Sequence, residues 1–303
     1  MVDNMKTLII ILGPTGVGKT ELSLRVAERF GSAIISADSR QIYRDIPVCT
    51  AAATAEQQAR VKHYFVGTHA LDQSFSAAQF ETDVLALLDQ LFAEQDVVVM
   101  AGGSMMYIDA VVKGIDDMPD VDPDIRASVR KQYEEEGLGA ILSQLKLLDP
   151  EYYNRVDQRN TQRVIHGVEM CLSTGKPFSS FHTGQRKERP FGIIQIGLQR
   201  ERQDLYERID QRVDQMFEQG LVEEARSVEH LRHLNSLNTV GMKEMFMYFD
   251  GVYTLEQAKE RICHNTHIYS KKQMTWFKRD KDILWYHPSQ IEKVLADISN
   301  LIG

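Results

Sequence analysis

An eight-residue segment near the N-terminus limits what this chain can fold into more than any other feature. It matches the pattern G-x-x-x-x-G-K-[ST], which is typical of a phosphate-binding loop between a buried strand and a helix. The segment consists of Gly13, Pro14, Thr15, Gly16, Val17, Gly18, Lys19 and Thr20. Its glycines let backbone N–H groups curl around an anion, and the following helix adds the positive end of its dipole. We predict that two or more linked phosphates bind here, with Lys19 as a point charge and the Thr20 hydroxyl as a ligand for Mg²⁺. The loop alone does not say whether the phosphates belong to a nucleotide.

The segments around this loop repeat a strand–helix pattern. A continuous apolar run at residues 8–12 suits a strand buried on both faces, and residues 20–30 carry apolar side chains at helical spacing. A second apolar run covers residues 33–37, and a helical pattern at 80–93 precedes a further strand at 97–101. Consecutive units of this kind indicate parallel strands joined by right-handed connections. The predicted fold class is therefore α/β, a P-loop type parallel sheet flanked by helices.

The pattern changes after an acidic, proline-bearing run at residues 116–123. From there to about residue 184 the spacing predicts helices and no strand. Asp122 followed by Pro123 is typical of a helix start, and Gly137 of its end. A strand pattern resumes at residues 191–198, before a mainly helical C-terminal third. We therefore predict an α/β core from residues 1–116 and 186–303, and an inserted all-helical domain at residues 117–185.

Composition narrows the class of protein further. The 303 residues include 35 Lys and Arg against 43 Asp and Glu, so the net charge is −8 and nucleic acid can bind only at a local patch. Cys49, Cys171 and Cys263 lie far apart, which excludes a CxxC motif and argues against a disulfide framework. No apolar stretch is long enough to span a membrane, and the N-terminus lacks the features of a signal peptide. We expect a reduced, cytoplasmic, soluble protein.

Asp38 follows the apolar run at residues 33–37. Ligands of open parallel sheets bind outside the carboxyl ends of the strands, so we expect Asp38 to face the same crevice as the phosphate-binding loop. Its carboxylate can hold Mg²⁺ through water or accept a proton as a general base. An ordinary role as the cap of the following turn is the third possibility. The sequence pattern does not choose among these roles.

A helix predicted at residues 202–218 carries Arg202, Arg208 and Arg212 beside an apolar stripe. These arginines either form a solvated face, with Asp204 pairing to Arg208, or clamp a departing phosphate. Two other stretches are locally basic. One is residues 259–281, with interleaved aromatic residues, and the other contains Arg155, Arg159 and Arg163. Each is either an exposed helix face or a track for a phosphate backbone. The scattered histidines suggest no zinc site.

Taken together, these segments resemble the bacterial tRNA dimethylallyltransferases, also called tRNA isopentenyltransferases. The resemblance spans nearly the whole chain and depends on the order and spacing of several motifs. They are residues 13–20; Asp38-Ser-Arg-Gln-Ile-Tyr43; Phe75-Ser-Ala-Ala-Gln-Phe80; Gly102-Gly-Ser-Met-Met-Tyr107; Gln162-Arg-Val-Ile-His166 with Glu169; Leu205-Tyr-Glu-Arg-Ile209 with Arg212; Thr239-Val-Gly-Met-Lys-Glu244; and Lys272-Gln-Met-Thr-Trp276.

The resemblance implies a particular reaction. The loop would hold the diphosphate of dimethylallyl diphosphate, and the acceptor would be N6 of adenosine 37, just 3′ of the tRNA anticodon. Negative charge develops on the leaving diphosphate, so Lys19, Thr20 with Mg²⁺, and an arginine should stabilise it. By resemblance, Asp38 is the general base and residues 15–20 cradle the diphosphate. Arg202 is the expected clamp, in preference to Arg208. We expect the chain to act as a monomer and to have no membrane as a partner.

The resemblance also implies residues that contact the anticodon stem-loop of tRNA. The target base must leave its stack to react, and it should then meet Ser39, Arg40 and Gln41. The inserted domain is expected to grip the tRNA. The implied contacts are Asp38, Ser39, Arg40, Gln41, Ser104, Arg126, Gln162, Arg163, Val164, Ile165 and His166.

The chain departs from the family pattern at several places. Where the family usually reads Gly-Thr-Ala-Lys-Pro, residues 49–53 read Cys-Thr-Ala-Ala-Ala. Where it usually reads Thr-Arg-Arg-Tyr-Ala-Lys-Arg-Gln, residues 266–273 read Thr-His-Ile-Tyr-Ser-Lys-Lys-Gln. These losses fall mostly on basic positions expected to face tRNA.

Two other functions fit the loop: a P-loop kinase acting on a small nucleoside-like acceptor, and a non-catalytic RNA-binding switch driven by a nucleotide.

Overall fold

The computed structural model describes residues 6–116 and 118–302, and the chain divides into two compact units. The core unit contains Met1–Val112 and Glu188–Gly303, and the insertion unit contains Lys113–Lys187. The insertion unit begins and ends at neighbouring points, since the Lys187 N–H donates to the Lys113 carbonyl over 2.8 Å. The core unit is therefore built from two stretches of chain that are distant in sequence.

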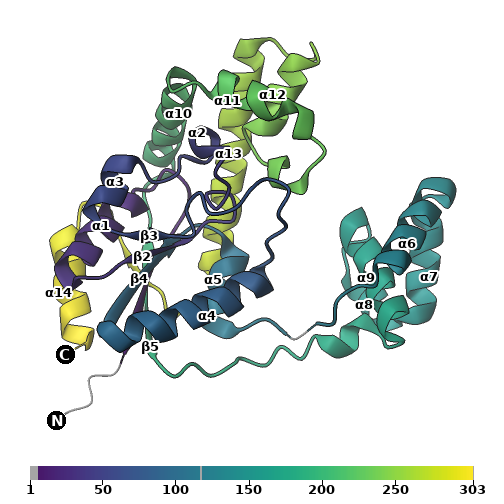
Figure 1. Ribbon diagram of the computed structural model, residues 1–303, viewed down its shortest axis with the longest axis horizontal. Coiled ribbons are helices and arrows are strands. Elements are labelled where there is room, and N and C mark those ends of the chain that lie inside the picture. Colours follow the sequence, from purple (N-terminus) through teal and green to yellow (C-terminus); the bar gives the residue numbers. More distant parts are fainter. Residues whose placement is uncertain (1–5, 117, 303) are drawn as a thin grey trace. The chain divides into compact units, whose positions relative to one another are not determined.

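One six-stranded parallel sheet forms the centre of the core unit (Figure 1). Its strands are Thr7–Leu12 (β1), Ile34–Ala37 (β2), His63–Tyr64 (β3), Val97–Gly102 (β4), Gly192–Leu198 (β5) and Leu284–Tyr286 (β6). They lie in the order β3-β2-β4-β1-β5-β6. The sequence predicts β1, β2, β4 and β5 to within a residue or two at each end. It does not predict β3 or β6, because two or three residues carry no readable periodicity.

Both faces of the sheet are buried, as the continuous apolar strands require. Alternate residues of β1 point to opposite faces, so Leu8 and Ile10 belong to one apolar cluster and Ile9 and Ile11 to another. The first cluster packs under α4 (Ala77–Glu94) and α5 (Met105–Lys113), and the second under α1 (Lys19–Phe30) and α14 (Ile291–Ile302). Figure 1 shows these two pairs of helices on opposite sides of the sheet.

A third apolar cluster joins five helices. They are α2 (Pro47–Thr50), α10 (Arg202–Glu218), α11 (Leu221–Val228), α12 (Met242–Phe249) and α13 (Leu255–Phe277). Of these, α10 and α13 contact the phosphate-binding loop. The short helix α3 (Ala55–Arg60) follows α2 and packs on α1.

The insertion unit is helical, with its own apolar cluster. Its helices are α6 (Pro123–Glu136), α7 (Leu138–Leu148), α8 (Pro150–Arg155) and α9 (Thr161–Thr174), followed by a 3₁₀ turn at Phe178–Phe181. As predicted, Asp122 caps α6 with its side chain, Pro123 occupies the first turn, and Gly137 follows the last residue. The Asp149 side chain caps α8 by accepting from the Tyr152 N–H.

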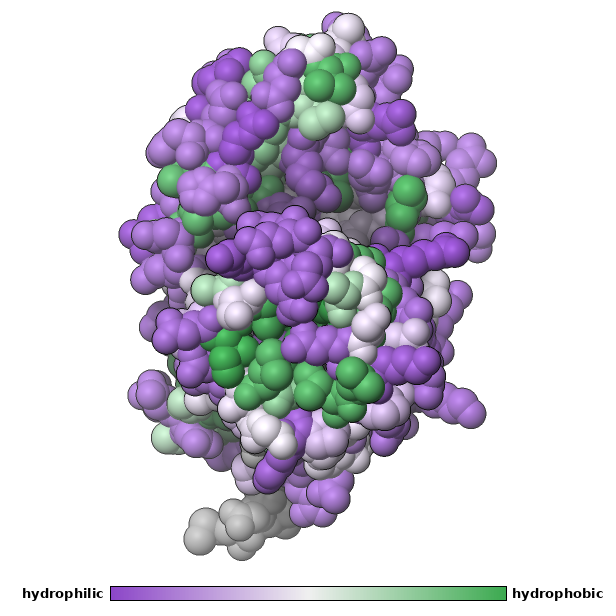
Figure 2. Space-filling model, turned by 90° about the vertical axis from the view of Figure 1, so that its right-hand side faces the viewer, coloured by the Kyte–Doolittle hydropathy of each residue, from purple (hydrophilic) through white to green (hydrophobic). Residues whose placement is uncertain are grey.

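The molecular surface seen in Figure 2 is mainly hydrophilic, with one gathering of apolar side chains near its centre. Among the described residues, no helix combines the length and the apolar content needed to cross a lipid bilayer. Cys49, Cys171 and Cys263 are all free thiols.

Candidate active site

The loop at residues 13–18 connects β1 to α1, as the sequence predicts. Two of its glycines are required by geometry. Gly13 has φ 147°, and a Cβ there would lie 2.7 Å from the Leu198 carbonyl oxygen. Gly18, at the N-cap of α1, has φ 110°. Left-handed backbone at these positions turns the loop back over the start of α1, where unpaired N–H groups and the helix dipole favour an anion.

Lys19 is held inside this loop. Its Nζ donates to the carbonyl oxygens of Gly13, over 3.0 Å, and of Pro14, over 2.8 Å. Burial lowers the pKa of Lys19 to about 7; the positive charge of Arg212 adds to this effect and the charge of Asp38 opposes it. A buried ammonium with so low a pKa lacks a sufficient counter-charge, and a diphosphate would supply one.

Asp38 comes directly after β2, at the carboxyl edge of the sheet. Its Oδ1 accepts from the backbone N–H groups of Arg40, at 2.9 Å, and Gln41, at 3.3 Å. These bonds fix the carboxylate through one of its oxygens, and Asp38 lines both of the cavities described next. The capping role considered for Asp38 is therefore present, and it orients the side chain for a second role.

Two adjoining cavities meet at Asp38. The P-loop cavity, of about 600 Å³, contains residues of the loop, the first turn of α1 and the polar face of α10. The side cavity, of about 310 Å³, has an apolar wall from Ile209, Val213, Met216 and Ile262. The residues that line both are Thr15, Asp38, Arg212 and Tyr269. An anion in the loop and a flat acceptor in the side cavity would thus both lie against Asp38.

The arginines of α10 are not equivalent. Arg212 Nη1 donates to Thr15 Oγ1, at 3.1 Å, and Arg208 Nε donates to the Gly16 carbonyl, at 3.1 Å. Burial lowers the pKa of Arg212, while the charge of Asp38 opposes this. Both arginines line the P-loop cavity, but of the two only Arg212 also lines the side cavity.

The preference for Arg202 is not supported by this geometry. Arg202 begins α10, is exposed, and places its guanidinium over the ring of Tyr206. The reason is the place where α10 contacts the loop. A Cβ on Gly16 would lie 3.0 Å from Ile209 Cγ1, so the contact is at Ile209, two helical turns after Arg202. The expected pair of Asp204 with Arg208 is also wrong, since Asp204 pairs with Arg200 at 2.7 Å.

Two further residues support the loop, although the sequence predicts no role for either. Gln273, which is buried on α13, accepts from the Thr15 N–H at 3.0 Å and donates to the Gly103 carbonyl at 2.8 Å. Arg200 donates to the Val17 carbonyl at 2.9 Å. Arg200 could have been found by the rule that located Asp38, because it closely follows a strand, β5, at the same sheet edge. Gln273 lies 258 residues from Thr15, and no local pattern links them.

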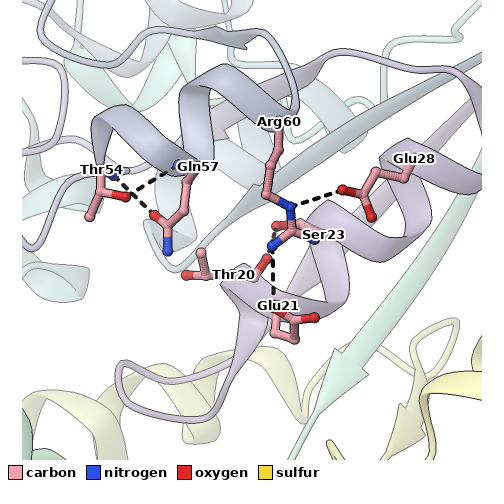
Figure 3. A network of polar contacts seen from close by, with 7 residues as sticks. All are labelled: Thr20, Glu21, Ser23, Glu28, Thr54, Gln57 and Arg60. Atoms are coloured by element: carbon pink, nitrogen blue, oxygen red, sulfur yellow. Dashed lines mark hydrogen bonds and ion pairs between the residues drawn. The ribbon is translucent and has the colours of Figure 1, made fainter.

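Thr20 lines the P-loop cavity at the first turn of α1, opposite α3. Figure 3 shows this junction: Thr54 and Gln57 form a capping box at the start of α3, and Arg60 binds Glu28 at 2.9 Å. Within residues 6–116 and 118–302, no cluster of three His, Cys, Asp or Glu side chains is arranged for a metal. A hydroxyl and diphosphate oxygens suit a hard cation such as Mg²⁺, so the donor set fits a metal that arrives with its substrate.

The expected tRNA-contacting residues of the core unit surround the side cavity. Ser104 Oγ accepts from the Ser39 N–H at 2.8 Å. Arg40 donates to the carbonyls of Asn235 and Ser236, at 3.0 and 3.1 Å. Asp38, Ser39, Arg40 and Ser104 all line this cavity. Gln41 instead lines the P-loop cavity, with its side chain bonded to the carbonyls that end α2.

The expected contacts of the insertion unit divide by exposure. Gln162 and Arg163 are exposed on the first turn of α9, and His166 and Arg126 both lie near the buried carboxylate of Glu169, at 3.6 and 3.8 Å. Val164 and Ile165 are buried in the apolar cluster of the unit. These two side chains cannot present themselves to RNA, because the amphipathic face of α9 turns them inward.

The fold and the site together define a P-loop enzyme in which a basic anion cradle faces an aspartate across a shared crevice. The model of the IPP transferase family matches residues 41–280, and the chain belongs to this family. The "tRNA dimethylallyltransferase 2" of Parabacteroides distasonis is 59% identical over 98% of this chain and 100% of that protein. The "tRNA dimethylallyltransferase 1" of Bacteroides fragilis is 58% identical over 96% of this chain and 97% of that protein.

Solved structures are similar over nearly the whole chain. The tRNA isopentenylpyrophosphate transferase from Bacillus halodurans is 31% identical, with a TM-score of 0.72, over 98% of this chain and 97% of that one. A eukaryotic dimethylallyltransferase acting on tRNA has a TM-score of 0.80 over 93% of this chain and 74% of that one. Its identity of 24% supports the shared fold alone.

Proposed function

We propose that this enzyme transfers the dimethylallyl group of dimethylallyl diphosphate to N6 of adenosine 37 in tRNA and releases diphosphate. The observation that carries the proposal is the meeting of the loop, Arg212 and Asp38 at one crevice, in a chain closely similar to proteins named tRNA dimethylallyltransferase. An anion cradle and a carboxylate base are the two groups that this alkyl transfer needs.

Each proposed residue acts on a defined atom. The adenine N6 attacks C1 of the allylic donor, and the bond from C1 to the diphosphate oxygen breaks with its electron pair leaving on that oxygen. Lys19, the loop N–H groups and Arg212 stabilise the charge that develops there. Asp38 Oδ2 accepts the proton that N6 loses. The bonds from Arg40 and Gln41 N–H to Oδ1 hold the carboxylate in place for this transfer.

Mg²⁺ bound to the diphosphate, with the Thr20 hydroxyl as its protein ligand, would add charge neutralisation at the leaving group. Lys19 and Arg212 have the same roles whether or not other groups complete the coordination of the metal. They bind the anion and exclude water from it. The side cavity, with Ser39, Arg40 and Ser104, would hold the flipped adenine. Exposed Gln162 and Arg163 on the insertion unit would contact the anticodon stem-loop.

A transfer assay with the full-length protein tests the proposal. The protein is incubated with labelled dimethylallyl diphosphate, Mg²⁺ and unmodified tRNA, and label in RNA is measured. We expect transfer to a tRNA with adenosine 37 and none to the same tRNA carrying guanosine there. Consumption of ATP without transfer of the allyl group would instead favour a kinase.

Asp38→Ala separates the two roles proposed for this residue. As a general base, Asp38 is needed for transfer but not for binding, so we expect transfer to be lost while diphosphate still binds. The binding is measured by calorimetry with inorganic diphosphate and Mg²⁺. Loss of both properties together would assign Asp38 to the metal rather than to the proton.

A further inference from the structure

The short helix α2 packs against α11, and its residues Cys49 and Thr50 line the side cavity (Figure 1). Its N-cap residue, Ile46, has no side chain that can accept a hydrogen bond, and Pro47 fills the first position. The N–H groups of the next two residues therefore need acceptors from elsewhere in the protein.

Glu224, in the first turn of α11, supplies both acceptors. Its Oε2 accepts from the Val48 N–H at 2.7 Å, and its Oε1 accepts from the Cys49 N–H at 2.8 Å. Burial raises the pKa of Glu224, and the two backbone N–H groups oppose that rise. Both oxygens of this half-buried carboxylate accept from the start of α2, so Glu224 caps that helix from another helix, α11.

The other end of α2 holds the residues of the active site. The Thr50 carbonyl accepts from Arg212 Nη2 at 3.2 Å and from Gln41 Nε2 at 3.3 Å. The Ala51 carbonyl accepts from Gln41 Nε2 at 3.1 Å. Ala51 has φ 43°, a conformation that a residue with a Cβ adopts only when its surroundings impose it. The helix is thus fixed at its start by Glu224 and at its end by Arg212.

We propose that Glu224 is a positioning residue for the transfer reaction: it fixes α2, and the Thr50 carbonyl at the end of α2 orients Arg212 toward the diphosphate. Glu224 touches neither cavity, so its effect passes through Arg212. The proposal rests on the proposed function, because it assigns Arg212 the leaving diphosphate as its partner. Glu224 thus acts from outside the cavities, by orienting the Arg212 guanidinium, which already carries the positive charge that the diphosphate needs.

Kinetics of Glu224→Ala in the full-length protein test this role. Misplacing Arg212 removes stabilisation of the transition state, so we expect kcat for transfer to tRNA to fall by about tenfold to a hundredfold. Glu224→Gln keeps one carbonyl acceptor and should lose less. Glu223→Gln, at the exposed neighbouring position on α11, is the matched control and should keep the unmodified rate.

The decisive measurement is the coupling with Arg212. In an Arg212→Ala background, Glu224→Ala should lower kcat little further, because the arginine that Glu224 orients is already absent. An equal fold-loss in both backgrounds, or an unmodified rate for Glu224→Ala, overturns the proposal. If Glu224→Ala lacks a cooperative thermal transition, Glu224→Gln is read by the same two criteria. Absence of transfer by the unmodified protein would instead refute the proposed function.

Discussion

Lys19 shows how this site is prepared for an anion. In the free protein its ammonium is satisfied by two loop carbonyls, and its pKa is lowered to about 7 by burial and by Arg212. A bound diphosphate supplies the missing negative charge and raises that pKa again. Binding near pH 8 should therefore take up a proton, approaching about one per site.

Calorimetry in two buffers of different ionisation enthalpy measures this proton uptake. Lys19→Met is the reference, because subtracting its value removes the titration of the diphosphate itself. The sign for stability follows from the same pKa. Above pH 10.5 Lys19 is neutral in both folded and unfolded chains, and below about pH 7 it is charged in both. The stability that Lys19→Met gains over the parent should therefore grow as the pH falls from 10.5 to 7; equal stability across this range would contradict the lowered pKa.

Arg212 and Arg202 give a matched comparison on one helix. Arg212 bonds to the phosphate-binding loop and lies against both cavities, whereas Arg202 is exposed at the start of α10. Removing one preorganised donor to a developing charge typically lowers the rate about a hundredfold or more. We expect that loss in kcat for Arg212→Ala, and a change within about twofold for Arg202→Ala. The reverse ranking would restore Arg202 as the clamp.

At the scale of single elements, caps decide where helices begin and what they hold together. Asp149 is fully buried in the insertion unit, caps α8, and accepts from the N–H and hydroxyl of Ser179 at 2.6 and 2.9 Å. Burial alone would raise the pKa of Asp149, but the hydrogen bonds from Tyr152 and Ser179 outweigh it and lower the pKa. One carboxylate thus joins α8 to the 3₁₀ turn.

Asp149→Ala should therefore loosen the insertion unit. The unmet N–H groups cost about 1–3 kcal/mol, seen as faster hydrogen exchange of amides at residues 149–181. Since the folded pKa of Asp149 is lowered, its stabilisation is complete above the ordinary value of 3.8 and disappears as the pH falls through the lower, folded value. Asp157→Ala, which removes an exposed turn carboxylate, serves as the control. Unchanged exchange in Asp149→Ala at pH 7 would show that the cap is dispensable.

At the scale of the whole molecule, the core and insertion units should separate two binding properties. The ends of the insertion unit are bonded to each other, so a short Gly-Ser linker can replace residues 114–186 without stretching the core. We expect this variant to keep diphosphate affinity within about twofold, because the whole loop and its partners belong to the core unit. Transfer to tRNA should fall at least about a hundredfold, since backbone contacts supply much of RNA affinity. Undiminished transfer would remove the proposed role of the insertion unit.

The sequence predicts those parts of the molecule whose causes are local. The phosphate-binding loop, the long strands and the caps at Asp122 and Gly137 each follow from a few adjacent residues. The choice among arginines does not, because it depends on where α10 touches the loop, which Ile209 and Gly16 decide together. Nor can the contacts of Gln273 and Glu224 be predicted, although Gln273 belongs to a motif, since their partners lie 258 and about 175 residues away. The motif that predicts tRNA contacts at Val164 and Ile165 does not reveal that their apolar side chains belong to the core of the insertion unit.

The contact between Gln273 and Thr15 also bears on how the protein is made. Thr15 of the loop is synthesised 258 residues before Gln273, whose side chain accepts from the Thr15 N–H. A polypeptide still growing on the ribosome therefore contains the motif before its contact with Gln273 can form. A fragment truncated before residue 273 would keep the whole motif and lack the side chain that fixes the Thr15 backbone.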